Sequence, residues 1–171
     1  MLCQISWYDS RIYERIEMLT HINEKSNPKM VNVGDKDITH RIAKVSGKIY
    51  MKPQTKERIK NDNLKKGAVL QTAIISAIMA SKKTSELIPM CHNILIDGVD
   101  VDIDEFDEGF ELIVTAYTTA KTGIEMEAIV ACSIGLATIY DMAKAIDREM
   151  VISDIKLLYK SGGKSGTFER K

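Results

Sequence analysis

Hydrophobic residues recur along the chain with two different periods, one typical of strands and one typical of helices. Over residues 41–51 they alternate with polar residues, which predicts a half-buried strand with Ala43, Val45, Ile49 and Met51 on its apolar face. Pro53 follows and predicts the first turn of a short polar helix over 53–61, because proline is tolerated there. From Gly67 to Lys83 the apolar spacing is helical and predicts a helix with a broad apolar face.

A strand hairpin is predicted in the middle of the chain. Apolar residues alternate before and after Gly98, but the phase shifts by one residue at this glycine, which predicts a β-bulge. Residues 107–109, Asp-Glu-Gly, indicate a turn, and alternation resumes over 110–116. The two alternating segments are therefore expected to pair as an antiparallel hairpin.

A second long helix is predicted over residues 122–147. Thr122 and Glu125 have the spacing of a capping box, in which each side chain pairs with a free backbone N–H of the first turn. Alternation over 155–159 then predicts a last strand. The order β-α-β-β-α-β favours an α+β, two-layer fold of the ferredoxin-like, split βαβ type, with an antiparallel sheet packed by two long helices. Many functions share this plan, so it does not decide function.

These elements divide the chain into three parts. We expect an N-terminal extension over 1–29, a single α+β domain over 30–160 and a glycine-rich mobile tail over 161–171. The chain has 171 residues, of which 44% are hydrophobic, and this suits one compact core.

Composition narrows the class of protein. Lys plus Arg and Asp plus Glu each total 24, so no net field favours nucleic acid or an anionic membrane as a partner. The three cysteines form no CxxC pair, and we expect a reducing, cytoplasmic location. The apolar stretch AIVACSIGLATIY is too short for a membrane span and predicts a buried helix. The first 18 residues do not have the pattern of a secretory signal.

The tail sequence SGGKSG raises the question of phosphate binding. A P-loop requires a glycine five residues before Gly163, where this chain has Leu158, so the Walker interpretation fails. Two interpretations stay open: a solvated terminal tail, or a glycine turn that closes over phosphate with the charges of Lys160 and Lys164.

Cys91 and His92 stand side by side between the first long helix and the hairpin. Neighbouring side chains on an extended chain point to opposite faces, so the two form a poor nucleophile pair. Cys91 has the alternative of a small buried apolar residue, and His92 that of a structural histidine. His92 is a candidate functional residue because it lies at the end of an element, where scaffolds present functional groups.

Charged residues mark both ends of the second long helix. Glu125 and Glu127 in its first turn suit the helix dipole, as does Lys144 near its end. Asp141 opposes the dipole and is therefore a candidate proton carrier, with Lys144 three residues away adjusting its pKa.

The length of this helix separates the glutamates in its first turn from Asp141 and Lys144 near its end. Glu127 and Asp141 are about 21 Å apart at a rise of ~1.5 Å per residue, too far for one small substrate. If both serve one reaction, a second copy of the chain must bring its helix start near the first copy's helix end. This predicts a homodimer with two shared sites.

Five blocks of the sequence resemble one known family. In order, between residues 19 and 168, they are KMVNVGDKDITHRIA, SKKTSELIPMCHNI, KTGIEMEA, IYDMAKAIDREMVI and LLYKSGGKSG. They closely resemble the MoaC family, the cyclic pyranopterin monophosphate synthases of molybdenum cofactor biosynthesis.

This resemblance implies a lyase that converts cyclic dihydro-GTP into cyclic pyranopterin monophosphate and releases pyrophosphate. The reaction needs proton transfer and phosphate binding rather than a redox cofactor, and we expect no cofactor and no metal. The resemblance also implies a hexamer built as a trimer of dimers, with its sites at the dimer interface. By motif, its catalytic residues fall on Lys66, His92, Asp141 and Lys144, and its substrate-binding residues on Met90, Cys91, His92, Glu125, Met126, Glu127 and Lys164.

The chain departs from the usual family pattern at six positions, namely Asn32, Ala68, Ile74, Met90, Asn93 and Ala120. Where an arginine is usual the chain has Ile74, which removes a possible phosphate or interface partner. Family members commonly begin near LTHIN, so Met18 is a candidate start. Two competing hypotheses are a ferredoxin-like nucleotide- or RNA-binding module without catalysis and an inactive paralogue. The scarcity of aromatic residues, 6% of the chain, disfavours RNA binding.

Overall fold

The computed structural model describes residues 21, 23, 25–61 and 64–171. Two compact units divide between Asn32 and Val33. In the first unit, the Asn23 side chain accepts backbone hydrogen bonds at 3.0 Å from Lys25 and from Asn27, which close a turn. The expectation of a start at Met18 lies outside the described residues.

The second unit is built on a five-stranded antiparallel sheet with the order β2-β3-β1-β4-β5. The strands are β1 (Thr39–Tyr50), β2 (Gly98–Phe106), β3 (Gly109–Ala120), β4 (Val151–Ser161) and β5 (Phe168–Glu169). The hairpin of β2 and β3 turns at residues 107–108, as predicted. The α+β class expected from the sequence is confirmed.

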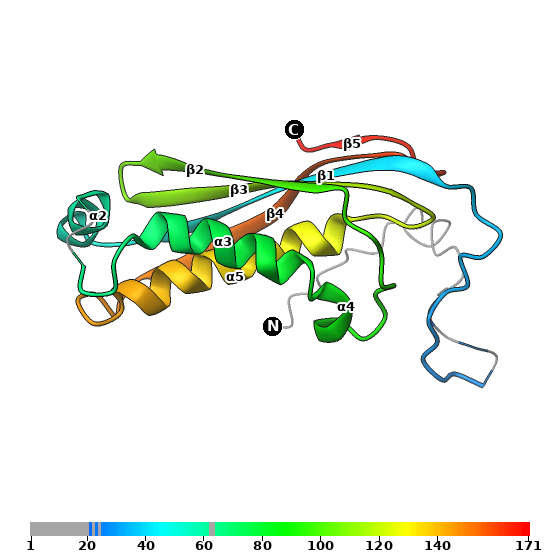
Figure 1. The fold of residues 1–171 in the computed structure, drawn as a ribbon, viewed down its shortest axis with the longest axis horizontal. Coiled ribbons are helices and arrows are strands. Elements are labelled where there is room, and N and C mark those ends of the chain that lie inside the picture. The colour runs from blue at the N-terminus through cyan, green and yellow to red at the C-terminus, as the bar shows by residue number, and fades with distance from the viewer. Residues whose placement is uncertain (1–20, 22, 24, 62–63) are drawn as a thin grey trace, which may run out of the picture. The chain divides into compact units, whose positions relative to one another are not determined.

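Helices cover one face of this sheet (Figure 1). They are α2 (Pro53–Lys60), α3 (Val69–Ser81), α4 (Thr84–Leu87) and α5 (Glu125–Ala143). The two long helices pack closely because small residues meet between them: a Cβ atom added at Gly135 would lie 3.3 Å from the Ala77 Cβ. A 2.8 Å hydrogen bond between Ser76 and Thr138 joins the same two helices.

The hydrophobic core lies between these helices and the sheet. Ile49, Leu112, Val114, Leu136 and Ile139 are completely buried in it. Glycine at position 47 lets β1 approach α5, because an added Cβ would lie 2.8 Å from Leu136. The helix α5 is long and apolar enough to cross a membrane, but 56% of its most apolar 18-residue stretch is buried inside the protein, as in a core helix.

Two expectations about local structure were wrong. The β2–β3 register runs without a shift from Gly98, so the bulge expected there is absent and the residues before it form a loop. Instead, β4 bulges against β1 near Asp154, which has φ 55°. The N-cap of α5 is Ile124, without a side-chain cap, so Thr122 forms no capping box.

The second long helix also ends earlier than expected. It stops at Ala143 rather than near Asp147, because the chain turns at residues 144–146. This turn leaves the Asp147 carboxylate free to bind the start of α2. Its Oδ2 accepts hydrogen bonds from the Lys52 backbone at 3.0 Å and from the Thr55 hydroxyl at 3.1 Å. Asp147 thereby acts as the cap that Lys52, the N-cap residue of α2, does not supply.

Candidate functional site

An acid and two lysines meet at the C-terminal end of α5. The Asp141 carboxylate lies 2.7 Å from the Lys144 ammonium and 2.8 Å from that of Lys66. Lys66 comes from the segment before α3 and also donates to the Asp141 backbone carbonyl at 2.9 Å, which satisfies an exposed group of the helix end. The structure thus brings Lys66 to Asp141 and Lys144, two residues that a single family motif contains.

This arrangement fixes the charge of Asp141. Lys144, and then Lys66, lower its pKa to about 2 through hydrogen bonds and opposite charge. The pKa of Lys144 is correspondingly raised by Asp141. At neutral pH the cluster therefore holds an ionised carboxylate between two ammonium groups. This composition suits a hydrogen-bond acceptor that positions the lysines better than it suits an acid that donates a proton.

The opposite end of α5 presents two glutamates in different environments. Glu127 is 4% exposed, and burial, followed by the charge of Glu125, raises its pKa. Glu125 is partly exposed and lies 3.4 Å from the Lys160 ammonium. The raised pKa makes Glu127 a candidate proton carrier.

The segment before β2 carries three more of the residues named by motif, Met90, Cys91 and His92. Cys91 and His92 are partly buried in a loop after α4 and not in a strand. Burial raises the pKa of the Cys91 thiol, and the charge of Glu127 adds to this, so the thiol is a weak nucleophile here. Met90 and Met126 are also partly buried.

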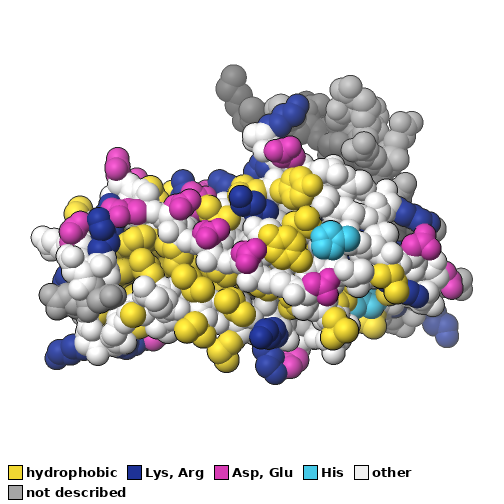
Figure 2. Space-filling view, turned by 45° about the horizontal axis from the view of Figure 1, so that its top comes forward, with side chains coloured by type: hydrophobic (Ala, Val, Ile, Leu, Met, Phe, Trp, Pro, Cys, Tyr) yellow, Lys and Arg dark blue, Asp and Glu magenta, His cyan; other side chains and the backbone are white. Residues whose placement is uncertain are grey.

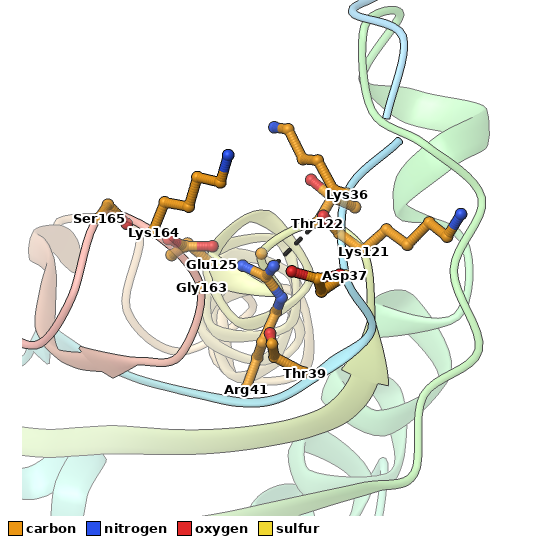
Figure 3. Close-up of a pocket in the computed structure, with 11 residues that line it drawn as sticks. Lys36, Asp37, Thr39, Arg41, Lys121, Thr122, Glu125, Gly163, Lys164 and Ser165 are labelled. Carbon is orange, nitrogen blue, oxygen red and sulfur yellow. Dashed lines mark hydrogen bonds between the residues drawn. The ribbon is translucent and has the colours of Figure 1, made fainter. Parts of the chain in front are cut away.

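A cavity of about 590 Å³ opens beside the start of α5 (Figure 3). Four basic and two acidic residues contribute to its lining, namely Lys36, Arg41, Lys121, Lys164, Asp37 and Glu125. Glu125 and Lys164 had been named as substrate-binding residues, and the structure places both in this cavity. The cluster around Asp141 is not part of the lining. We call this cavity the basic pocket.

Arg41 on β1 is held in the basic pocket by two hydrogen bonds to backbone carbonyls. Its guanidinium donates to the carbonyl of Ala120 at 3.0 Å and to that of Lys121 at 3.2 Å. The third nitrogen, Nη1, faces Gly163, where an added Cβ would lie 2.4 Å away. Figure 3 shows Arg41 between the turn that carries Lys164 and the segment that carries Lys36. Such a fixed, planar donor suits a phosphate group.

Sequence reasoning had not selected Lys36, Arg41 or Lys121. They come from the segment before β1, from β1 itself and from the residue after β3, so no spacing along the chain indicates that they meet. Among the described residues, no three His, Cys, Asp or Glu side chains come together as metal ligands.

Comparison with known proteins agrees with the resemblance noted in the sequence. The model of the MoaC family matches residues 30–163, well over half of the chain. The chain belongs to the MoaC family. A cyclic pyranopterin monophosphate synthase of Helicobacter pylori (strain G27) is 57% identical over 156 residues, which cover 90% of this chain and 99% of the relative. The enzyme of that name from Campylobacter jejuni subsp. jejuni serotype O:23/36 (strain 81-176) is 59% identical over 154 residues, 89% and 98% of the two chains.

Proposed function

We propose that this MoaC-family chain is a lyase that converts 3',8-cyclo-7,8-dihydro-GTP into cyclic pyranopterin monophosphate and releases pyrophosphate, a step of molybdenum cofactor biosynthesis. The observation that carries the proposal is its identity of 57–59% to cyclic pyranopterin monophosphate synthases across about nine tenths of the chain. The lysine–aspartate cluster and the buried Glu127, whose residues the family motifs name, support the proposal.

The basic pocket is the proposed site for the triphosphate. Arg41, Lys36 and Lys164 supply positive charge from three segments, and positive φ at Gly162 and Gly163 forms the turn beside them. In a chain of zero net charge, such a local concentration of cations supports anion binding. The tail beyond Ser161 would then serve as a mobile cover over the phosphates.

The proposed division of labour gives proton transfer to Glu127 and His92. Asp141, ionised and bound to both lysines, holds Lys66 and Lys144 toward the substrate. Burial raises the pKa of Glu127, which supports a role in proton exchange. Cys91, Met90 and Met126 would contact the ring system of the substrate.

If Glu127 and Asp141 serve the same reaction, a second copy of the chain must complete the site. A substrate cannot span the roughly 21 Å between Glu127 and Asp141 of one protomer, so we propose sites shared between protomers, in a hexamer built as a trimer of dimers. Apolar side chains gather on one face of the molecule (Figure 2). On α3, Ile75 is 59% and Met79 63% exposed, which supports a protein contact there. The proposal includes a cytoplasmic location. It also includes a ferredoxin-like plan, which the position of β3 between β1 and β2 supports.

The direct test supplies the purified chain with 3',8-cyclo-7,8-dihydro-GTP and follows cyclic pyranopterin monophosphate and pyrophosphate together. Both products should form in equal amounts without an added redox cofactor. A chain that forms neither product, and binds single-stranded oligonucleotide better than GTP, would instead support the non-catalytic nucleic-acid module.

A further inference from the structure

Lys160 on β4 contacts two of the residues that line the basic pocket, Glu125 and Ser165. Its ammonium is 3.4 Å from Oε1 of Glu125 and 2.6 Å from the hydroxyl of Ser165. Lys160 itself is not part of the lining, and its side chain is 23% exposed. A lysine in this position can shape the pocket without contacting a ligand in it.

The two partners of Lys160 belong to different walls of the pocket. Glu125 is in the first turn of α5, and its other carboxylate oxygen lies over Gly123, where an added Cβ would be 1.9 Å from Oε2. Ser165 belongs to the turn that carries Gly163 and Lys164. One ammonium therefore joins the start of α5 to the glycine turn.

Lys160 is itself well anchored. Its backbone pairs with Ala43 of β1 on one side and with Phe168 of β5 on the other. The electrostatic contacts of a mostly buried ammonium are screened less by water and salt than those of a surface lysine. The two contacts of Lys160 can therefore keep Glu125 and Ser165 at a fixed separation. Small displacements of binding groups weaken the recognition of a charged substrate considerably.

We propose that Lys160 is a positioning residue for substrate binding: by holding Glu125 and Ser165 together, it sets the distance between the start of α5 and the glycine turn that carries Lys164. The proposal rests on the proposed function of the basic pocket as the triphosphate site. Its effect is exerted through Glu125 and the turn, not through contact with the substrate.

The experiment compares Lys160→Met with Lys160→Arg in the full-length chain. Lys160→Met should raise KM about tenfold and leave kcat within about twofold, as expected when a binding geometry is lost but the chemistry is not. Lys160→Arg should recover most of the loss, because a guanidinium has enough donors to reach both partners. Calorimetric binding of GTP, used as a stable probe, should weaken in parallel with KM.

Lys60→Met is the matched control. Lys60 also joins two elements, since its ammonium lies 3.8 Å from Glu57 on α2 and 3.0 Å from Glu105 on β2, yet it is outside the basic pocket. The Lys60→Met substitution removes the same charge as Lys160→Met and should leave KM unchanged. Arg41→Met, a direct change in the pocket, should raise KM at least as much as Lys160→Met.

The possible outcomes separate the two hypotheses. If Arg41→Met raises KM but Lys160→Met does not, the positioning role is wrong and the proposed triphosphate site stands. If neither variant changes KM, the basic pocket is not the substrate site, and both ideas fail. Should Lys160→Met unfold, Ser165→Ala removes the contact with the turn alone; an unchanged KM in that variant would also overturn the positioning role.

Discussion

Lys66 and Asp141 are 75 residues apart in the chain, yet their side chains meet at 2.8 Å. The same carboxylate binds Lys144 at 2.7 Å, so one acid organises two cations at the end of α5. Because both lysines hold its pKa at about 2, Asp141 stays ionised throughout the physiological range. The pair connects the segment before α3 to the helix end and creates a fixed group of charges at the protein surface.

Asp141→Asn should abolish turnover, with kcat falling at least a hundredfold, while the fold stays intact. The amide keeps the shape of the side chain but removes the charge that holds both lysines. The pKa of Lys144, now raised by Asp141, should return toward its ordinary value, so the alkaline limb of any residual activity moves to lower pH. The measurement is a pH–rate profile with circular dichroism as the folding check. Near-normal turnover would contradict the assignment.

Glu127→Gln should change stability in a pH-dependent way. Burial raises the pKa of Glu127 in the folded state, while the pKa of a glutamate in the unfolded chain is about 4.3. As pH rises from the unfolded to the folded pKa, the unfolded state loses its proton first, so the wild type loses stability over that interval. The Tm of Glu127→Gln relative to wild type should therefore be higher at pH 8 than at pH 4. An equal difference at both values would mean that the pKa is not raised.

Gly163→Ala should weaken GTP binding about tenfold by displacing Arg41. Gly163 has φ 74°, and its added Cβ would lie 2.4 Å from Nη1 of Arg41. Gly166→Ala is the matched control, because φ there is 67° but nothing lies within 4 Å of the added Cβ. Both variants pay roughly 1–2 kcal/mol of backbone strain. Calorimetry should show weaker binding in the first variant alone; equal loss in both would assign the effect to strain in the turn.

The sequence predicted the elements whose periodicity is strong and missed those without it. The apolar residues Ala43, Val45 and Ile49 of β1 lie at alternate positions, and α3 and the body of α5 show helical spacing, so these elements were placed well. The four residues of α4 and the two of β5 are too few to show a period. The shift of phase at Gly98 marks the point where a loop enters β2, a change that alternation alone cannot distinguish from a bulge.

The candidate site divides in a similar way. Family motifs named Lys66, Asp141 and Lys144, and charge opposing the helix dipole had already singled out Asp141. Neither argument could show that the three side chains touch, since this depends on how the segment before α3 packs against the end of α5. The cations Lys36 and Arg41 gave no local signal, because only the fold brings them to Lys164.

Asp147→Asn should destabilise the protein by about 2–4 kcal/mol, because an amide group would face backbone donors at a side chain that is 2% exposed. Burial opposes ionisation of Asp147, but hydrogen bonds from the Lys52 and Glu149 backbones and from Thr55 hold its pKa below the ordinary value. This stability is present above the unfolded pKa of about 3.9 and is lost as pH falls through the folded pKa. Urea unfolding should show the gap between variant and wild type narrowing below about pH 4.

Glu149→Gln is the control for that measurement. The Glu149 side chain is 77% exposed and forms a 2.6 Å ion pair with Lys52, so its loss should cost at most about 1 kcal/mol. A comparable loss of stability in both variants would show that the surface ion pair, and not the buried cap, stabilises the start of α2.

Mixing two inactive variants tests whether protomers share their sites. Asp141→Asn removes a group from one end of α5 and Glu127→Gln from the other, so in a mixed dimer one shared site carries both changes and its counterpart carries neither. Random reassembly makes about half of the dimers mixed, and one intact site in each predicts about a quarter of wild-type activity.

Each variant alone should stay near zero, because both of its sites are damaged. The double variant Asp141→Asn/Glu127→Gln mixed with wild type is the matched control: its mixed dimers have one damaged group in each shared site, so only the wild-type homodimers are active and activity should fall from about half of the wild-type value before exchange to about a quarter after it. Product formation after refolding the variants together is the measurement. If the mixture of single variants stays inactive while both assemble normally, each protomer must complete its own site, and the roughly 21 Å between the helix ends must be bridged in some other way.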